Sequence, residues 1–146
     1  MKRRVAVRGI VVLDNKLLCV RLKAYDGKPA TDYWCLPGGG VDPGEPILPA
    51  LAREIVEETG VAPKIGNLVY IQQFIHNGTE QMELFFHITN VKDYKNIDIT
   101  KASHGPTEIE ELDFIDPTKH YVLPELLATE TFDSLATQPP KIFNYL

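Results

Sequence analysis

Residues 39–61 read GGVDPGEPILPALAREIVEETGV, and the middle of this segment has the pattern of an amphipathic helix. Between about residues 47 and 59, apolar side chains recur at helical spacing and form one face: Leu48, Leu51, Ala52, Ile55 and Val56. Pro46 and Pro49 fall at the start, where their missing N–H groups would have no partner inside the helix anyway. Gly60 suits the position after the helix, where a left-handed backbone is common. The segment therefore predicts a helix with defined ends.

Three carboxylates lie on this expected helix at positions that bring them together. Glu54, Glu57 and Glu58 are spaced i, i+3 and i+4, so they project as one cluster. Their mutual repulsion costs helix stability, and Arg53 offsets only part of it. Hard divalent cations, in contrast, prefer several converging carboxylate oxygens. A pair of glutamates on a solvated helix is also common. The cluster therefore indicates either a metal site or an ordinary charged helix surface.

The flanking residues favour the metal site. Together with Gly39, Glu45, Gly60 and Val61, the segment matches every specified position of G-x5-E-x7-R-E-U-x-E-E-x-G-U, where U is a bulky aliphatic residue. This pattern is the Nudix box, and the chain resembles the Nudix hydrolase family, as a MutT-type or unassigned member. The preceding WCLPGG, residues 34–39, is also similar to the family's entry into the box. The resemblance implies an α+β fold, a Nudix-type α/β/α sandwich with a mixed sheet and a loop–helix–loop motif.

The same resemblance implies roles for the residues of the box. Its metal ligands would be Glu54, Glu57 and Glu58, joined by a backbone carbonyl of Gly38 or Gly39, and the metal would be Mg²⁺ or Mn²⁺. A contact between Arg53 and Glu45 would orient the start of the helix and the ligands. The implied reaction is hydrolysis of a phosphoanhydride (pyrophosphate) bond in a nucleoside diphosphate linked to another moiety. The substrate is then a small nucleotide, with a nucleoside triphosphate favoured by elimination.

The identity of the catalytic base stays open between two regions of the chain. A carboxylate is expected to take the proton of the attacking water. Glu54 is the first choice, with Glu57 beside it in the catalytic cluster. Glu108 is the alternative, because it precedes an expected strand over 109–115 and is free to reach inward. Glu110 and Glu111 lie in the same region, although both could be ordinary solvated charges.

Substrate contacts have weaker signals in the sequence. Arg8, Arg21 and Lys23 lie on the first expected hairpin, where this family often contacts phosphate or base, although strand-surface charge is an equally simple explanation. Trp34 and Phe85 could stack on a base, whereas aromatic residues more often belong to a core. The four histidines have no ligand-like spacing, so none is assigned to metal.

The remaining segments suggest mainly strands with one helix in the middle and one at the end. The sequence predicts a hairpin of Arg4–Leu13 with Lys16–Lys23, and a second hairpin of Leu68–Ile75 with Gln81–Val91 that has the turn Asn77-Gly78. Another strand is expected over Ile109–Ile115. A closing helix is expected over Val122–Leu135, followed by an irregular tail over Thr137–Leu146.

Composition limits the class of protein. A chain of 146 residues with 44% hydrophobic and 24% charged residues is expected to fold as a single domain over residues 1–146. The net charge of −5 argues against extended nucleic acid as a partner. The sequence shows no signal peptide or membrane-spanning segment, so we expect a cytoplasmic monomer or homodimer. Cys19 and Cys35 lie in apolar runs and indicate buried thiols.

Two other functions compete with this hypothesis. A non-catalytic Nudix-fold module for nucleotide sensing or interaction would be expected to lose box glutamates, and this chain keeps them all. An isoprenoid diphosphate isomerase would need a further catalytic cysteine and histidine context, for which Cys35 is the only starting point. The sequence therefore favours the hydrolase.

Overall fold

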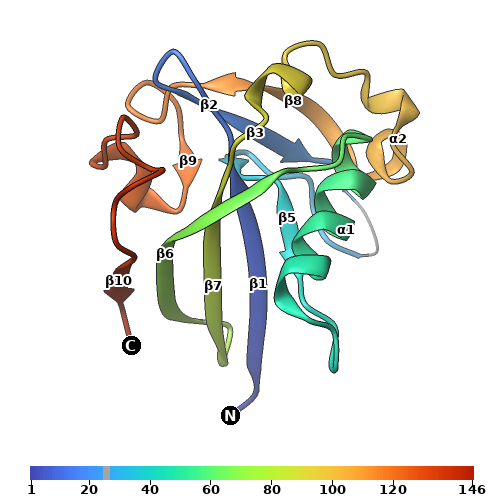
Figure 1. Cartoon of the computed structure of the whole chain (residues 1–146). Helices are drawn as coiled ribbons and strands as arrows, with labels where there is room; N and C mark the ends of the chain where they lie inside the picture. Colours follow the sequence, from blue (N-terminus) through green and yellow to red (C-terminus); the bar gives the residue numbers. More distant parts are fainter. Residues whose placement is uncertain (25–26) are drawn as a thin grey trace.

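The computed structural model describes residues 1–24 and 27–146. Its strands are β1 (Arg3–Ile10), β2 (Val12–Leu13), β3 (Lys16–Leu22), β4 (Trp34–Cys35), β5 (Gly38–Gly40), β6 (Ile65–His76), β7 (Thr79–Ile88), β8 (Ile109–Ile115), β9 (Val122–Leu123) and β10 (Lys141–Asn144). Its helices are α1 (Ile47–Thr59) and α2 (Gly105–Glu108), with 3-10 turns η1 (Val91–Tyr94), η2 (Ile99–Lys101) and η3 (Glu125–Ala128). The fold is α+β, as predicted (Figure 1).

The strands form two sheets. The larger sheet has the order β10-β6-β7-β1-β5 and is mixed, because β1 runs parallel to β7 while β6 and β5 run antiparallel to their neighbours β7 and β1. The smaller sheet has the order β2-β3-β4-β9, and β8 also pairs with β3. Strand β5, which consists of three glycines, is thus the edge of the larger sheet.

The first expected hairpin is shorter than predicted. Only β2 pairs with β3, through a turn in which Asp14 and Asn15 have positive φ angles of 52° and 60°. Strand β1 belongs to the other sheet, where Ala6 lies opposite Gly40. The second hairpin, β6 with β7, is confirmed with its turn at Asn77 and Gly78, and β8 has the predicted bounds.

The C-terminal predictions were wrong in two places. In place of a closing helix over Val122–Leu135, the structure has β9 and the short turn η3. Pro124 is extended, with ψ of 154°, and the polar stretch after Thr129 has few strong helix formers, so the leucines are buried from a turn and loop instead. The tail, expected to be irregular, contains β10, whose Lys141 lies opposite Tyr70 of β6.

Helix α1 packs against β1 and β5 of the larger sheet (Figure 1). Leu51 and Ile55 are buried as predicted, but Leu48 and Val56 are 48% and 39% exposed. The buried face instead includes Ala50, Glu58 and Thr59. The helix is therefore rotated relative to the predicted face, which turns its last carboxylate toward the sheet.

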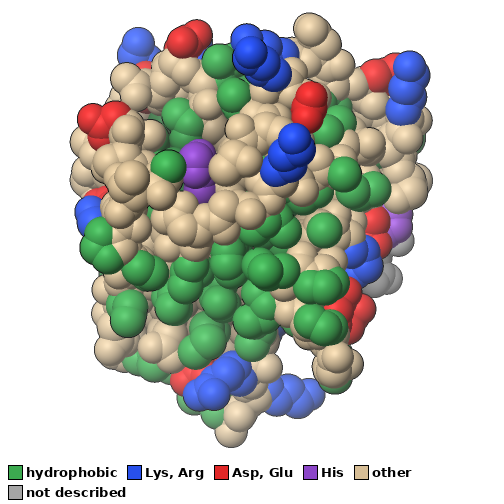
Figure 2. Space-filling model, viewed as in Figure 1, with side chains coloured by type: hydrophobic (Ala, Val, Ile, Leu, Met, Phe, Trp, Pro, Cys, Tyr) green, Lys and Arg blue, Asp and Glu red, His purple; other side chains and the backbone are tan. Residues whose placement is uncertain are grey.

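Part of the larger sheet is not covered by α1. In Figure 2, hydrophobic side chains gather over β6, β7 and β1 beside the helix. Ile75 of β6 is half exposed, and Ile47 at the start of α1 is also exposed. Among the helices of residues 1–24 and 27–146, none is long and apolar enough to cross a membrane.

Candidate active site

The end of α1 fixes the candidate site beside β5. Gly60 follows the helix with φ of 75° and donates its N–H to the carbonyl of Val56, as its predicted capping position requires. The Thr59 hydroxyl donates to the carbonyl of Ile55 at 2.7 Å, which further secures the last turn. Glu57 and Glu58 therefore belong to a turn with a well-defined end.

Glu58 points into the protein and contacts the edge strand. Its carboxylate accepts the N–H of Gly38 at 2.7 Å, and the residue is only 5% exposed. Gly38 has φ of 143°, and a Cβ at this position would lie 2.0 Å from the carbonyl oxygen of Val7, so no larger residue fits. Burial raises the pKa of Glu58 to about 8, against the opposing effects of the Gly38 N–H and of Arg8.

Glu54 lies directly over Gly39. A Cβ added to Gly39 would lie 2.5 Å from Oε2 of Glu54, so the carboxylate occupies space that any other residue at position 39 would take. Burial raises the pKa of Glu54, and the charge of Arg53 opposes this shift. The glycine of the box thus has a direct steric role: it lets a carboxylate approach the backbone of β5.

Arg53 connects the loop before α1 to the carboxylates on the helix. Its Nε and Nη2 donate to the two oxygens of Glu45 at 2.7 and 2.9 Å, a bidentate pair. Nη1 donates to Glu54 at 3.1 Å and to Glu57 at 3.3 Å, and Nη2 reaches the carbonyl of Gly40 at 3.3 Å. The hydrogen bonds from Arg53, and to a smaller extent the one from the N–H of Asp42, lower the pKa of Glu45 to about 2. This geometry supports the orienting role expected for Glu45 and Arg53.

His104 connects Glu108 to the cluster, and no pattern in the sequence predicted this role. Its Nδ1 lies 3.4 Å from Oε2 of Glu57 and 3.6 Å from Oε1 of Glu108. Its backbone N–H donates to the carbonyl of Glu57, and its carbonyl accepts the N–H of Glu108. A single histidine far along the chain can be placed beside α1 only by the fold.

The other late carboxylates lie on β8 and not in the cluster. Glu110 and Glu111 are exposed, and Glu111 pairs with Arg21 at 3.6 Å. The guanidinium carbon of Arg21 lies 5.7 Å from the ring centroid of Trp34. Lys23 donates from Nζ to the carbonyl of Pro106 in α2 at 3.0 Å, so it lies near Glu108.

Two residues expected to contact substrate have other positions. Phe85 is fully buried and packs edge-to-face with Tyr70, so the prediction that it stacks on a base does not fit the structure. Both faces of β7 are packed at this point, with Phe85 in one core cluster and the next residue, Phe86, in the other. Arg8 pairs with Glu83 at 3.3 Å and donates to the carbonyls of Leu36 and Gly38. Most of the N–H groups of its guanidinium therefore already have a partner within the protein.

The box residues offer the ligands that a hard divalent cation prefers. The carboxylate of Glu54 lies against the bare backbone of Gly39, in the space that a Cβ would fill, Glu58 contacts Gly38, and Glu57 lies in the same turn of α1. Within the described residues, no three acidic, histidine or cysteine side chains converge on one point. The reason is local: Arg53 lies between Glu54 and Glu57, and Glu58 turns to Gly38, because separated carboxylates repel less. Binding of a divalent cation would therefore require the glutamate side chains to rotate, while the helix keeps its position.

Comparison with known proteins agrees with this arrangement. The model of the NUDIX domain family matches residues 2–137. The chain is 45% identical over 65 residues to ADP-ribose pyrophosphatase of Methanocaldococcus jannaschii, a match that covers 44% of this chain and 37% of that protein. It is 28% identical over 136 residues to RNA pyrophosphohydrolase of Erythrobacter litoralis, covering 82% and 78% of the two chains.

Solved structures share the fold. The MutT NUDIX hydrolase from Burkholderia pseudomallei superposes with a TM-score of 0.63 at 24% identity, over 80% of this chain and 85% of that one. The E. coli ORF135 protein superposes with a TM-score of 0.65 at 22% identity, over 87% and 85%. At such identities the likeness establishes the architecture, and the predicted fold class is confirmed.

Proposed function

Because the chain belongs to the Nudix family, we propose that it is a hydrolase that cleaves the phosphoanhydride bond of a nucleoside diphosphate linked to another moiety. The observation that carries this proposal is the position of Glu54 over Gly39, with Glu57 and Glu58 in the adjoining turn. Several acidic side chains held close together at a backbone edge repel one another, whereas they suit binding of a cation, and the cation can in turn hold a diphosphate. The resemblance seen in the box and the family match lead to the same enzyme class.

Divalent metal is the cofactor expected throughout the family, and Mg²⁺ or Mn²⁺ is our proposal here. The ligands would be Glu54, Glu57 and Glu58 with a carbonyl of Gly38 or Gly39. Bound metal would supply charge neutralisation on the diphosphate and acidity for a water molecule. Arg53 can release Glu57 and still keep both hydrogen bonds to Glu45, so the loop before α1 stays in place when the carboxylates reorient.

A carboxylate of the cluster must accept the proton of the attacking water. We propose Glu54 for this role, because burial already raises its pKa and favours proton uptake. Glu108 is the alternative, since His104 places it beside Glu57. Arg21, Lys23 and Trp34 stay candidate contacts for substrate, with Lys23 anchored next to Glu108.

The substrate is proposed to be a small nucleotide. Two relatives are named ADP-ribose pyrophosphatase and RNA pyrophosphohydrolase, and both names describe cleavage of a pyrophosphate bond next to a nucleotide. The net charge of −5 argues against extended nucleic acid as a partner. A cytoplasmic monomer or homodimer without a membrane partner is part of the proposal. The Cys35 thiol donates to the carbonyl of Val20, and burial raises its pKa to about 11, so it gives an isomerase no reactive thiolate.

A substrate panel tests the proposal. Nucleoside triphosphates, ADP-ribose, sugar nucleotides and dinucleoside polyphosphates are incubated with Mg²⁺, with Mn²⁺ and with chelator, and the products are separated. We expect metal-dependent cleavage of at least one class, and Glu57→Gln should lower that rate by about 100-fold or more while the protein stays folded. Glu110→Gln on the exposed strand β8 is the matched control and should retain the wild-type rate.

A catalytically silent protein that binds nucleotide in the same panel would favour the non-catalytic sensing module instead. Equal rates for Glu57→Gln and wild type would remove the acidic turn of α1 from the reaction.

A further inference from the structure

Arg4 differs from the other arginines of the chain in its contacts. The other four each lie within salt-bridge distance of a carboxylate, in the pairs Arg3 with Glu80, Arg8 with Glu83, Arg21 with Glu111, and Arg53 with Glu45. Arg4 has no carboxylate partner in the described part of the chain. Its one side-chain hydrogen bond runs from Nη1 to Oε1 of Gln81, at 3.4 Å. A cation without a salt-bridge partner thus lies at the beginning of β1.

The surroundings of Arg4 make this arrangement costly. Burial first, and then the neighbouring charge of Arg8, lower the pKa of Arg4, and the carboxylates of Glu83 and Glu54, which lie beyond salt-bridge distance, offset this shift only in part. A part-buried cation needs compensation for its charge, and a ligand with the opposite charge can supply it.

Arg4 also lies next to the candidate active site. Its Nη2 is 3.5 Å from the position that a Cβ on Gly40 would take. The carbonyl of Gly40 accepts from Arg53, and Glu54 covers the adjoining Gly39. The guanidinium therefore lies across the glycine edge strand from the carboxylates of α1, within reach of a molecule that extends past this edge.

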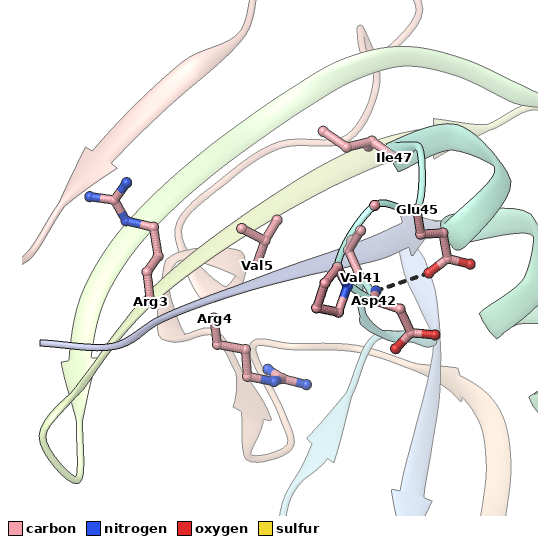
Figure 3. Close-up of a pocket in the computed structure, with 9 residues that line it drawn as sticks. Arg3, Arg4, Val5, Val41, Asp42, Glu45 and Ile47 are labelled. Atoms are coloured by element: carbon pink, nitrogen blue, oxygen red, sulfur yellow. Dashed lines mark hydrogen bonds between the residues drawn. The ribbon is translucent and has the colours of Figure 1, made fainter.

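There is room for a ligand at this point. An open cavity of about 530 Å³ lies between the first residues of β1 and the 41–47 loop, and its charged lining residues are Arg3, Arg4, Asp42 and Glu45. Glu45 is already paired with Arg53, and the side chain of Asp42 is largely exposed. Figure 3 shows that Arg3 and Arg4 project from β1 in different directions, and that Arg4 lies on the side of Val41 and Asp42. Arg3 also borders this cavity, but its side chain is 58% exposed and its charge is paired with Glu80, so it is a neighbour of equal charge that needs no ligand.

We propose that Arg4 binds a phosphate of the substrate other than the pair being cleaved, and thereby directs the enzyme toward 5′-triphosphates. The inference rests on the proposed function, because it takes the scissile diphosphate to lie at the carboxylates of α1. A guanidinium forms paired, charge-assisted hydrogen bonds with phosphate oxygens. A sugar linked to a diphosphate would present only hydroxyl groups to Arg4, whereas a third phosphate supplies the missing charge. A free nucleoside triphosphate and the 5′ end of an RNA offer the same group.

Kinetics of Arg4→Gln test the proposal, with Arg3→Gln as the matched control. The substrates are four nucleoside triphosphates, ADP-ribose and a short RNA with a 5′-triphosphate. For the triphosphates that the wild type cleaves, we expect Arg4→Gln to lower kcat/KM by about 10- to 100-fold, mainly through KM. Its kcat/KM for ADP-ribose and all values for Arg3→Gln should stay within about threefold. Arg4→Lys should recover part of the loss, because it keeps the charge and loses the paired geometry.

Binding of inorganic tripolyphosphate, followed by calorimetry with and without Mg²⁺, gives a readout that needs no turnover. Arg4→Gln should weaken this binding about tenfold and Arg3→Gln should leave it unchanged. Equal binding by both variants, or an equal loss of kcat/KM for ADP-ribose and triphosphates, would overturn the proposal. If the wild type cleaves nothing, the proposed function fails, and tripolyphosphate binding still decides the role of Arg4. Activity on only one of the two triphosphate sources identifies which of them the site accepts.

Discussion

At the scale of single residues, Gly39 and Glu54 depend on each other. The carboxylate of Glu54 occupies the volume of an absent side chain, so any larger residue at position 39 would displace that carboxylate, even though the backbone of Gly39 has no positive φ. Gly38 is constrained in a different way, by the close approach of Val7 and by its φ of 143°. Neighbouring glycines of one strand therefore serve two separate purposes, one steric toward the helix and one conformational within the sheet.

This dependence predicts the effect of replacing Gly39 with alanine. The added Cβ would displace the carboxylate of Glu54, and we expect the affinity for Mn²⁺, measured by calorimetry or electron paramagnetic resonance, to fall about tenfold or more. Gly40→Ala is the control, because its Cβ would meet only the guanidinium of Arg4, at an ordinary contact distance of 3.5 Å. If both variants bind Mn²⁺ as the wild type does, Glu54 has no part in the metal site.

At the scale of elements, the rotation of α1 matters more than its existence. Burial of Ala50 and Glu58 in place of Leu48 and Val56 turns one acidic side chain to the strand and leaves Glu57 at the surface of the cluster. The short helix α2 then closes the site from the other side, since His104 before it contacts Glu57. Gly105 is required here, because a Cβ would lie 1.9 Å from the carbonyl oxygen of Ile99.

The position of Glu108 at the end of α2 leads to a kinetic prediction. Its carboxylate reaches Glu57 only through His104, so we expect Glu108→Gln to lower kcat less than tenfold at saturating Mg²⁺. Glu54→Gln, measured under the same conditions, should lose about 100-fold or more. A 100-fold loss in Glu108→Gln with unchanged Mg²⁺ affinity would transfer the role of base from Glu54 to Glu108.

At the scale of the whole molecule, the two sheets bury Glu58 between a helix and an edge strand at a cost in stability. The pKa of this carboxyl rises from an ordinary value near 4.5 to about 8 in the folded protein. Between these values the folded state holds a proton that the unfolded state has released. The free energy of unfolding must therefore fall as the pH rises from about 4.5 to 8, and the penalty is absent below that window.

Chemical unfolding in the presence of a chelator checks this prediction. We expect the wild type to lose on the order of a few kcal/mol of stability across the window, and Glu58→Gln to lose clearly less. The amide of glutamine still accepts the N–H of Gly38, so the variant keeps the local contact. Glu110→Gln should follow the wild type, because Glu110 is exposed. A pH slope that is the same in all three proteins would mean that Glu58 ionises normally.

The sequence by itself determined the helix from Ile47 to Thr59, its capping glycine, the β6–β7 hairpin and the carboxylates of the box. These features depend on short spacings and on local backbone preferences, which a chain displays without its tertiary contacts. The match to the Nudix box added the family, and with it the expected pairing of Arg53 with Glu45.

Only the tertiary structure decided which face of α1 is buried, that β1 leaves the first hairpin, and that β10 replaces an irregular tail. It also brought His104 to Glu57 and Arg4 to the glycine edge, from distant parts of the chain. The physical reason is that strand pairing and side-chain burial depend on partners far away in sequence, and local propensity carries no information about those partners.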